Sequence, residues 1–201
     1  MDTRPIAELE GCRISHLTLD ARVAALTDAQ AKEPSLLPGW SRGHLLTHLA
    51  RNADSIVRRL EGAMRNEIAD QYLGGEQGRA QEIEAGANRS AEELIADLSG
   101  ASAAVDAAFA AMPNDAWERL GRSYTGAESP VSGLALTRWK EVEIHLLDLD
   151  LGYGPSDWPD AFVESALPGV LRSLKRRADT HALLAWAINR SAGAPELGPW
   201  G

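Results

Sequence analysis

Apolar residues recur at intervals of three and four positions along most of the chain, which is the spacing of amphipathic helices. The first periodic segment predicts a helix over residues 6–27, with a broad apolar side formed by Ile6, Leu9, Ile14, Leu17, Val23 and Leu26. The second predicts a helix over residues 41–64 that is capped by Ser41. Its apolar positions are Leu45, Leu49, Ile56, Val57 and Leu60.

Two further helices are predicted in the second half of the chain. Ser90 and Glu93 form a capping box that begins a third helix, which Pro113 ends near residue 112. A fourth helix is predicted over residues 132–151 and ends at Gly152. Between the helices, residues 74–89 are polar and glycine-rich and predict a loop, and residues 114–132 predict irregular structure with a short hairpin.

Four helices of about twenty residues predict an all-α fold, a four-helix bundle over residues 1–153. The segment GYGPSDWP is then a linker, and residues 154–201 form a short, mainly helical C-terminal extension. Within the extension, we expect a helix from about Pro159 that Pro168 interrupts or kinks, and a last helix over residues 180–191.

Composition and charge narrow the class of protein. Hydrophobic residues make up 44% of the chain and the net charge is −9, so neither nucleic acid nor an anionic membrane is expected as a partner. We find no signal peptide and no apolar run of about 18 residues that would span a bilayer. Cys12 is the single cysteine, which excludes an intrachain disulfide and favours a cytoplasmic location.

The segment RWKEVEIHLLDLDLG, at 138–152, places several acidic residues around His145. Helical positions four apart lie about 40° apart, whereas positions two apart lie about 200° apart. Glu141 therefore lies beside His145, and Glu143 points away from it. The pair offers one carboxylate oxygen and one imidazole nitrogen to a common point, although such pairs also occur on solvated helices.

The second predicted helix supplies a third candidate ligand. His48 lies between Leu45 and Leu49, so it borders the stripe that faces the bundle interior, whereas His44 falls in the first turn. A buried histidine of this kind can also be purely structural.

Together, His48, Glu141 and His145 would form a site with two nitrogens and one oxygen. This set suits Zn²⁺ or another divalent metal and leaves a coordination position open, as in catalytic zinc sites. Asp148 and Asn52 lie one turn beyond His145 and His48, and each is either a residue that orients a metal ligand or an ordinary polar residue.

The segments LLPGWSRGHLLTHLARNADSI and TRWKEVEIHLLDLDLG resemble the mycothiol-dependent maleylpyruvate isomerase family of the DinB-like metalloenzyme superfamily, over roughly residues 5–155. The resemblance implies a DinB-like four-helix bundle with a divalent metal, usually zinc, held by His48, Glu141 and His145. Members of the family carry a further α/β domain, whereas the C-terminal region here is short. The segment LLAWAINRSAG resembles their last helix, and Arg190 would hold a substrate carboxylate there, or merely stabilise a helix end.

The resemblance implies an enzyme that activates mycothiol, a low-molecular-weight thiol, for attack on a small-molecule electrophile. The reaction would be isomerisation of maleylpyruvate to fumarylpyruvate or an S-transfer, and the short C-terminal region favours transfer. A metal-dependent hydrolase on the same bundle would need a general base. A non-catalytic helical protein that dimerises through a bundle face is a further alternative, and a homodimer is left open for the enzyme too.

Overall fold

The computed structural model describes residues 4–198, which form two compact units, one ending at Trp158 and the other beginning at Pro159. The first unit is helical apart from one small hairpin, and the second is helical. The predicted all-α class is confirmed. The division follows Trp158 because the indole of Trp158 and the hydroxyl of Tyr153 both donate hydrogen bonds to Glu143 and so tie this segment to the first unit.

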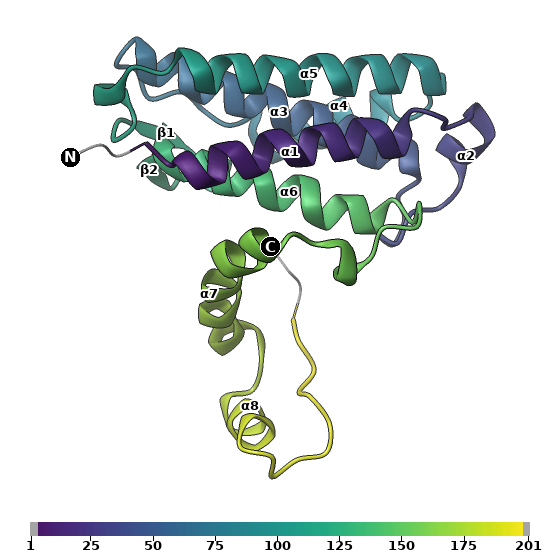
Figure 1. Cartoon of the computed structure of the whole chain (residues 1–201), viewed down its shortest axis with the longest axis vertical. Helices are drawn as coiled ribbons and strands as arrows, with labels where there is room; N and C mark the ends of the chain where they lie inside the picture. Colours follow the sequence, from purple (N-terminus) through teal and green to yellow (C-terminus); the bar gives the residue numbers. More distant parts are fainter. Residues whose placement is uncertain (1–3, 199–201) are drawn as a thin grey trace. The chain divides into compact units, whose positions relative to one another are not determined.

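Four long helices build the first unit: α1 (Ile6–Val23), α3 (Arg42–Met64), α5 (Ala91–Ala111) and α6 (Leu134–Asp148). Helix α3 packs against both α5 and α6, and helix α1 packs against the same two helices (Figure 1). The core between these helices is rich in leucine because each helix buries an apolar stripe. Its fully buried leucines include Leu19, Leu45, Leu46, Leu49 and Leu98.

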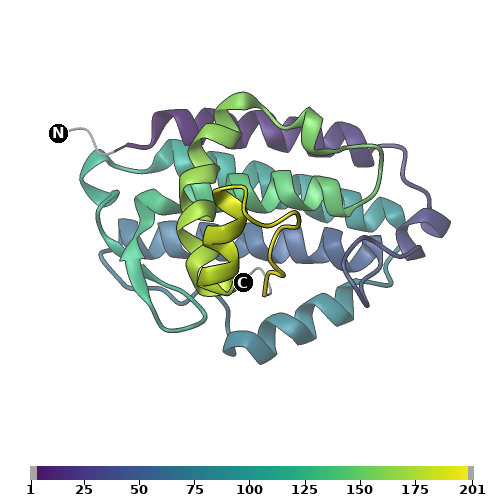
Figure 2. The same ribbon diagram turned by 90° about the horizontal axis from the view of Figure 1, so that it is seen from below.

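The predicted loop over residues 74–89 is wrong, because this segment forms helix α4 (Gly75–Gly86) on the outer side of α3 (Figure 2). Two of its glycines, Gly78 and Gly86, allow close packing. A Cβ at Gly78 would lie 2.0 Å from the carbonyl oxygen of Leu73, and one at Gly86 would lie 2.5 Å from a methyl group of Thr47. The helix is therefore stabilised by its contact with α3, which sequence composition does not reveal.

The first predicted helix is shorter than expected and faces the core differently. Helix α1 ends at Val23, and a capping box at Thr27 begins the separate short helix α2 (Asp28–Lys32). The predicted apolar side is wrong in part, because Ile6, Ile14 and Leu17 are largely exposed. The buried face carries Cys12, Ser15, His16, Leu19 and Val23, and its polar members are stabilised by hydrogen bonds to α5 and α6.

The third predicted helix is confirmed as α5, which begins at the capping box of Ser90 and Glu93 and ends before Pro113. By length and composition alone, α5 is also apolar enough to cross a membrane, so the expectation that no such stretch exists is wrong. The mean hydropathy of α5 is high because the helix contains many alanines. Its buried residues recur at three- and four-residue intervals and pack against α3 and α1, as in a bundle core.

The hairpin predicted between the third and fourth helices is confirmed, with strand β1 (Leu120–Arg122) antiparallel to β2 (Glu128–Pro130). A 3-10 turn over Val131–Gly133 then leads into α6. Helix α6 ends at Asp148, earlier than the predicted residue 151. The left-handed backbone of Asp150, with φ of 53°, prevents the helix from reaching Gly152.

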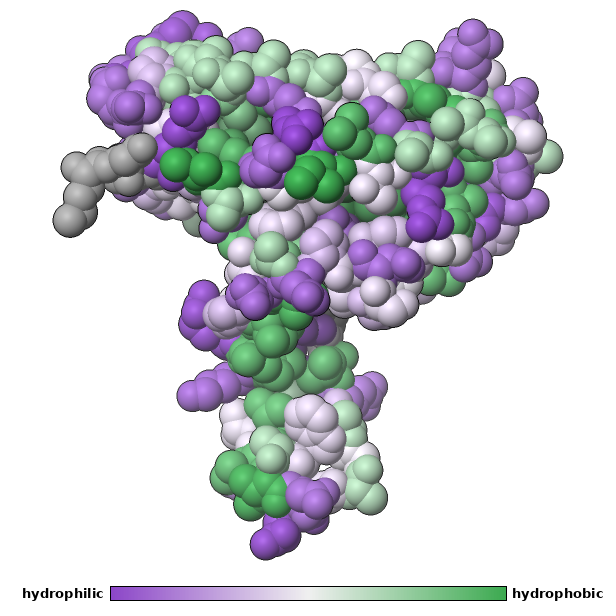
Figure 3. Space-filling model, viewed as in Figure 1, coloured by the Kyte–Doolittle hydropathy of each residue, from purple (hydrophilic) through white to green (hydrophobic). Residues whose placement is uncertain are grey.

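The second unit contains helices α7 (Asp160–Arg177) and α8 (Thr180–Ala187). The predicted interruption at Pro168 is wrong, because α7 continues through it. A proline removes only one intrahelical hydrogen bond, and the turns on either side hold the helix. Helix α8 ends before residue 191 because Asn189 adopts a left-handed conformation. Exposed apolar side chains of this unit (Figure 3) include Leu167, Leu171, Leu184, Trp186 and Ile188.

Candidate metal centre

Helices α3 and α6 carry the predicted ligands and pack directly against each other. A capping box also fixes the start of α3, where Ser41 accepts a hydrogen bond from the backbone of His44 and the His44 ring accepts one from the backbone of Ser41. His48 lies one turn further along α3, among buried leucines. Glu141 and His145 occupy successive turns of α6, as their four-residue spacing predicts.

The three side chains converge between the helices. Oε2 of Glu141 lies 3.0 Å from Nε2 of His48 and 3.5 Å from Nε2 of His145. One potential ligand atom from each residue lies within 4.8 Å of the other two. The His48 side chain is 5% exposed, whereas that of Glu141 is 29% exposed, so solvent reaches the group from the Glu141 side.

The donor set fits a divalent ion. Ligands about 2.0–2.1 Å from a tetrahedral zinc ion lie roughly 3.3 Å from one another. The two contacts of Glu141, at 3.0 and 3.5 Å, fall on either side of that value. Two imidazole nitrogens and one carboxylate oxygen leave the fourth position open to another molecule.

Asp148 holds the outer nitrogen of His145, with Oδ2 lying 2.8 Å from Nδ1. Although burial opposes protonation, hydrogen bonds to Asp148 and Glu141 raise the pKa of His145 to about 9. Burial likewise opposes the charge of Glu141, but hydrogen bonds from His145 and His48 hold its pKa well below the usual range. In the metal-free protein, a protonated His145 therefore bridges two carboxylates, and a metal ion must displace its proton.

His48, in contrast to His145, is neutral. Burial lowers its pKa below the ordinary value, so the ring is neutral at pH 7. Nη2 of Arg79 lies 3.2 Å from Nδ1 of His48. Because a guanidinium can only donate, Nδ1 is the acceptor, and the single ring proton is on Nε2, facing Glu141.

Arg79 and Trp40 contact His48, and Tyr72 lies against Arg79. The sequence analysis assigned a role to none of these three residues. The indole of Trp40 meets the His48 ring edge-on, with centroids 5.6 Å apart. The guanidinium of Arg79 lies 5.9 Å from the Trp40 ring and 5.8 Å from the Tyr72 ring. Arg79 was missed because it lies on α4, within the segment predicted as a loop.

Asn52 does not contact the triad through a hydrogen bond within the described residues; its side-chain oxygen accepts one from Arg138, at 3.0 Å. Arg138 is completely buried, one turn before Glu141. It also donates to Nε2 of His16, whose Nδ1 lies 3.0 Å from Asp106. Asn52 thus belongs to a buried polar network beside the triad, in which the His16 ring is hydrogen-bonded to Arg138 on one side and to Asp106 on the other.

Glu143 lies away from the triad, as its position two residues from His145 predicts, but it is not a surface acid. It is 1% exposed and accepts hydrogen bonds from the hydroxyl groups of Ser15 and Tyr153. The hydroxyl of Ser15 in turn accepts a hydrogen bond from the indole of Trp139. Glu143, on α6, therefore links α6 to α1 through Ser15 and to the following segment through Tyr153.

The remaining candidates lie outside the triad. His44 contacts Glu84 at 3.3 Å and caps α3. Arg190 is an exposed residue of the second unit, and its side chain donates to the carbonyl group of Asn189. Its proposed role in holding a substrate carboxylate stays a prediction.

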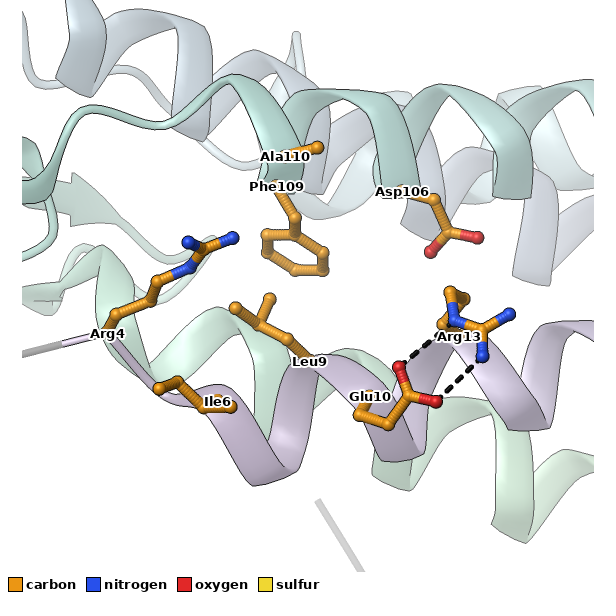
Figure 4. Close-up of a pocket in the computed structure, with 8 residues that line it drawn as sticks. All are labelled: Arg4, Ile6, Leu9, Glu10, Arg13, Asp106, Phe109 and Ala110. Atoms are coloured by element: carbon orange, nitrogen blue, oxygen red, sulfur yellow. Dashed lines mark hydrogen bonds and ion pairs between the residues drawn. The ribbon is translucent and has the colours of Figure 1, made fainter.

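A pocket of about 340 Å³ lies between the start of α1 and the end of α5 (Figure 4). Its apolar part is formed by Leu9 and Phe109, with the paired Glu10 and Arg13 at one edge. Its lining includes none of the triad residues, so it does not provide access to the candidate metal centre.

Two solved structures of mycothiol-dependent maleylpyruvate isomerases match the fold of this chain. The crystal structure of a mycothiol-dependent maleylpyruvate isomerase matches with a TM-score of 0.78 and 25% identity, covering 83% of this chain and 69% of that one. The crystal structure of a histidine-to-alanine mutant of a mycothiol-dependent maleylpyruvate isomerase matches with a TM-score of 0.81 and 24% identity, covering 87% and 73%. A comparison with curated protein sequences gives no significant match.

The family comparison covers the helices that hold the triad. The model of the mycothiol maleylpyruvate isomerase N-terminal domain matches residues 12–150, which span α1 to the end of α6 and include His48, Glu141 and His145. The protein therefore belongs to the family of the mycothiol maleylpyruvate isomerase N-terminal domain.

Proposed function

We propose that the protein is a zinc-dependent enzyme that activates mycothiol for attack on an electrophilic substrate and catalyses a cis–trans isomerisation. The convergence of His48, Glu141 and His145 on one point carries the proposal. Zinc is inferred because two imidazoles and one carboxylate are a typical catalytic zinc set. Family membership supports mycothiol as the thiol.

The residues around the triad have defined tasks in this proposal. A divalent ion would supply an open coordination position that lowers the pKa of a thiol and favours its nucleophilic form. Asp148 fixes the orientation of His145 through Nδ1, so that Nε2 points at the shared site. Trp40 packs against the His48 ring and restricts its rotation. Buried Arg138 supports the helices from beneath.

The reaction needs no net change in the thiol. Its thiolate would add to one carbon of the substrate double bond, and the electron pair of that bond would move onto the conjugated carbonyl group. After rotation about the new single bond, the pair would return, re-form the double bond and expel the same thiolate. An S-transferase would use the same residues but leave the thiol attached to the product. Similarity to a solved mycothiol-dependent maleylpyruvate isomerase supports isomerisation over transfer.

The test combines metal analysis with turnover assays on the purified full chain. We expect about one equivalent of zinc per chain, and conversion of maleylpyruvate only when mycothiol is added. Consumption of mycothiol in proportion to product would indicate transfer, and thiol-independent hydrolysis would favour a hydrolase. A protein that binds no divalent metal would contradict the proposal and favour a non-catalytic bundle.

A further inference from the structure

Arg79 is a partly buried cation beside the candidate metal centre whose charge is not matched by an acid. It contacts Nδ1 of His48 and lies near the Trp40 and Tyr72 rings, with centroid distances of 5.9 and 5.8 Å. Within residues 4–198, no carboxylate forms an ion pair with it. A guanidinium held between aromatic rings is oriented and keeps most of its donors available for a planar anion.

The contact between Arg79 and His48 is incompatible with metal ligation. It requires an unprotonated Nδ1, so the ring proton is on Nε2, the nitrogen that faces Glu141 at 3.0 Å. A neutral imidazole that binds a metal through Nε2 carries its proton on Nδ1. The N–H group of Arg79 and the N–H group at Nδ1 of His48 would then face each other. Neither can accept a hydrogen bond, so Arg79 would have to move away from His48.

Within the described residues, Arg79 forms no ion pair with the exposed acids of its own helix, Glu76 and Glu82, and the two carboxylates at the triad are already engaged. Glu141 and Asp148 are engaged with the triad histidines. Among the described residues, buried Arg59 donates only to Ser55 of its own helix, so it adds a further positive charge without a paired carboxylate. A divalent ion together with Arg79 and Arg59 would carry four positive charges. These face the two negative charges of Glu141 and Asp148, which favours an anionic ligand.

We propose that Arg79 is a substrate-binding residue of this site, holding a carboxylate of the electrophile, and that metal loading makes it available by releasing it from His48. The inference rests on the proposed function, because it needs a metal on Nε2 of His48. It also couples two binding events. Because Arg79 is released when His48 binds the metal, bound metal would raise the affinity of the protein for a carboxylate, and bound carboxylate would raise its affinity for the metal.

The test uses an unreactive probe, succinate, and its mono-amide succinamate, which has the same size but one charge fewer. Calorimetric titrations would compare zinc-loaded full-length wild type with Arg79→Gln, Arg79→Lys and, as a matched surface control, Arg65→Gln. Arg65 forms an exposed ion pair with Glu67 and caps the far end of α3. Circular dichroism would verify that each variant is folded.

We expect wild type to bind succinate more tightly than succinamate. Arg79→Gln should weaken succinate binding by about 10- to 100-fold, the range for loss of a charged hydrogen bond, and abolish the preference over succinamate. Arg79→Lys should retain part of the preference, and Arg65→Gln all of it.

Zinc affinity without carboxylates gives the second readout, by competition with a chelator. Arg79→Gln should bind zinc as tightly as wild type or more tightly, because the contact that opposes ligation is gone. A 10- to 100-fold loss would show instead that Arg79 supports His48 structurally, and would overturn the inference.

The outcomes also separate this inference from the proposed function. Zinc binding by wild type with no succinate binding, or with equal succinate binding by Arg79→Gln, would overturn the inference alone. Failure of wild type to bind zinc would overturn the proposed function and the inference together.

Discussion

Nε2 of His48 lies 3.0 Å from Oε2 of Glu141, although 93 positions separate the two residues in the chain. The contact joins α3 to α6 and places a buried neutral imidazole against a carboxylate whose pKa is held well below its usual range. With His145 one turn from Glu141, it defines the site on which the functional proposal depends.

Loss of a triad residue should remove the metal. We expect His48→Ala and Glu141→Gln to lower zinc affinity by more than about 100-fold, since even residues that only orient ligands contribute 10- to 100-fold. Elemental mass spectrometry of the purified variants would measure this, and thiol-dependent turnover should disappear in parallel. Glu84→Gln is the control, because Glu84 is an exposed acid on α4 that contacts His44. Full zinc occupancy in Glu141→Gln would contradict the assignment.

Zinc binding should depend on pH through His145. Its pKa is raised to about 9 in the metal-free protein, so at pH 7 the proton on Nε2 must leave before that nitrogen can bind a metal. We therefore expect release of about one proton per zinc and an affinity that rises about tenfold per pH unit below 9. Calorimetry in buffers of different ionisation enthalpy would count the protons. An affinity unchanged between pH 6 and 8 would show that His145 is not a ligand.

Asp148 should act on the metal through His145. Asp148→Asn removes the charge 2.8 Å from Nδ1, which should lower zinc affinity by about 10- to 100-fold while leaving the helix in place. Chelator competition would measure the change. Asp150→Asn provides the comparison, because Asp150 follows α6 but is exposed. Equal affinities in the two variants would make Asp148 an ordinary polar residue.

Glu143 should be needed for stability rather than for metal binding. Glu143→Ala would leave the hydroxyl groups of Ser15 and Tyr153 without their buried acceptor, at a cost of about 2–5 kcal/mol in the free energy of unfolding. Urea denaturation of the metal-free protein would measure this cost. The folded variant should still bind one zinc. Glu143→Gln keeps an acceptor oxygen and should lose less stability, whereas loss of zinc in either folded variant would contradict the separation between Glu143 and the triad.

Much of the fold follows from local sequence patterns. The capping boxes at Ser41 and Ser90, Pro113 and the helical periodicity locate α3 and α5 because each acts within one or two turns. The pairing of Glu141 with His145 is equally local, since four-residue spacing alone places both side chains on one face of α6. Local patterns failed in α1, where Ile14 and Leu17 are exposed while Ser15 and His16 are buried by their partners on α5 and α6.

The sequence by itself determined the four long helices of the bundle, the Glu141–His145 pair and His48 as a third candidate, because these depend on the period of the helix and on the side that faces the core. Only the tertiary structure decided that Arg79 reaches His48 and that Arg138 lies buried beneath Asn52. Helix α4 is glycine-rich, and its place against α3 depends on close contacts such as that of Gly86 with Thr47. Such contacts join residues that are distant in the chain, so no periodic pattern encodes them.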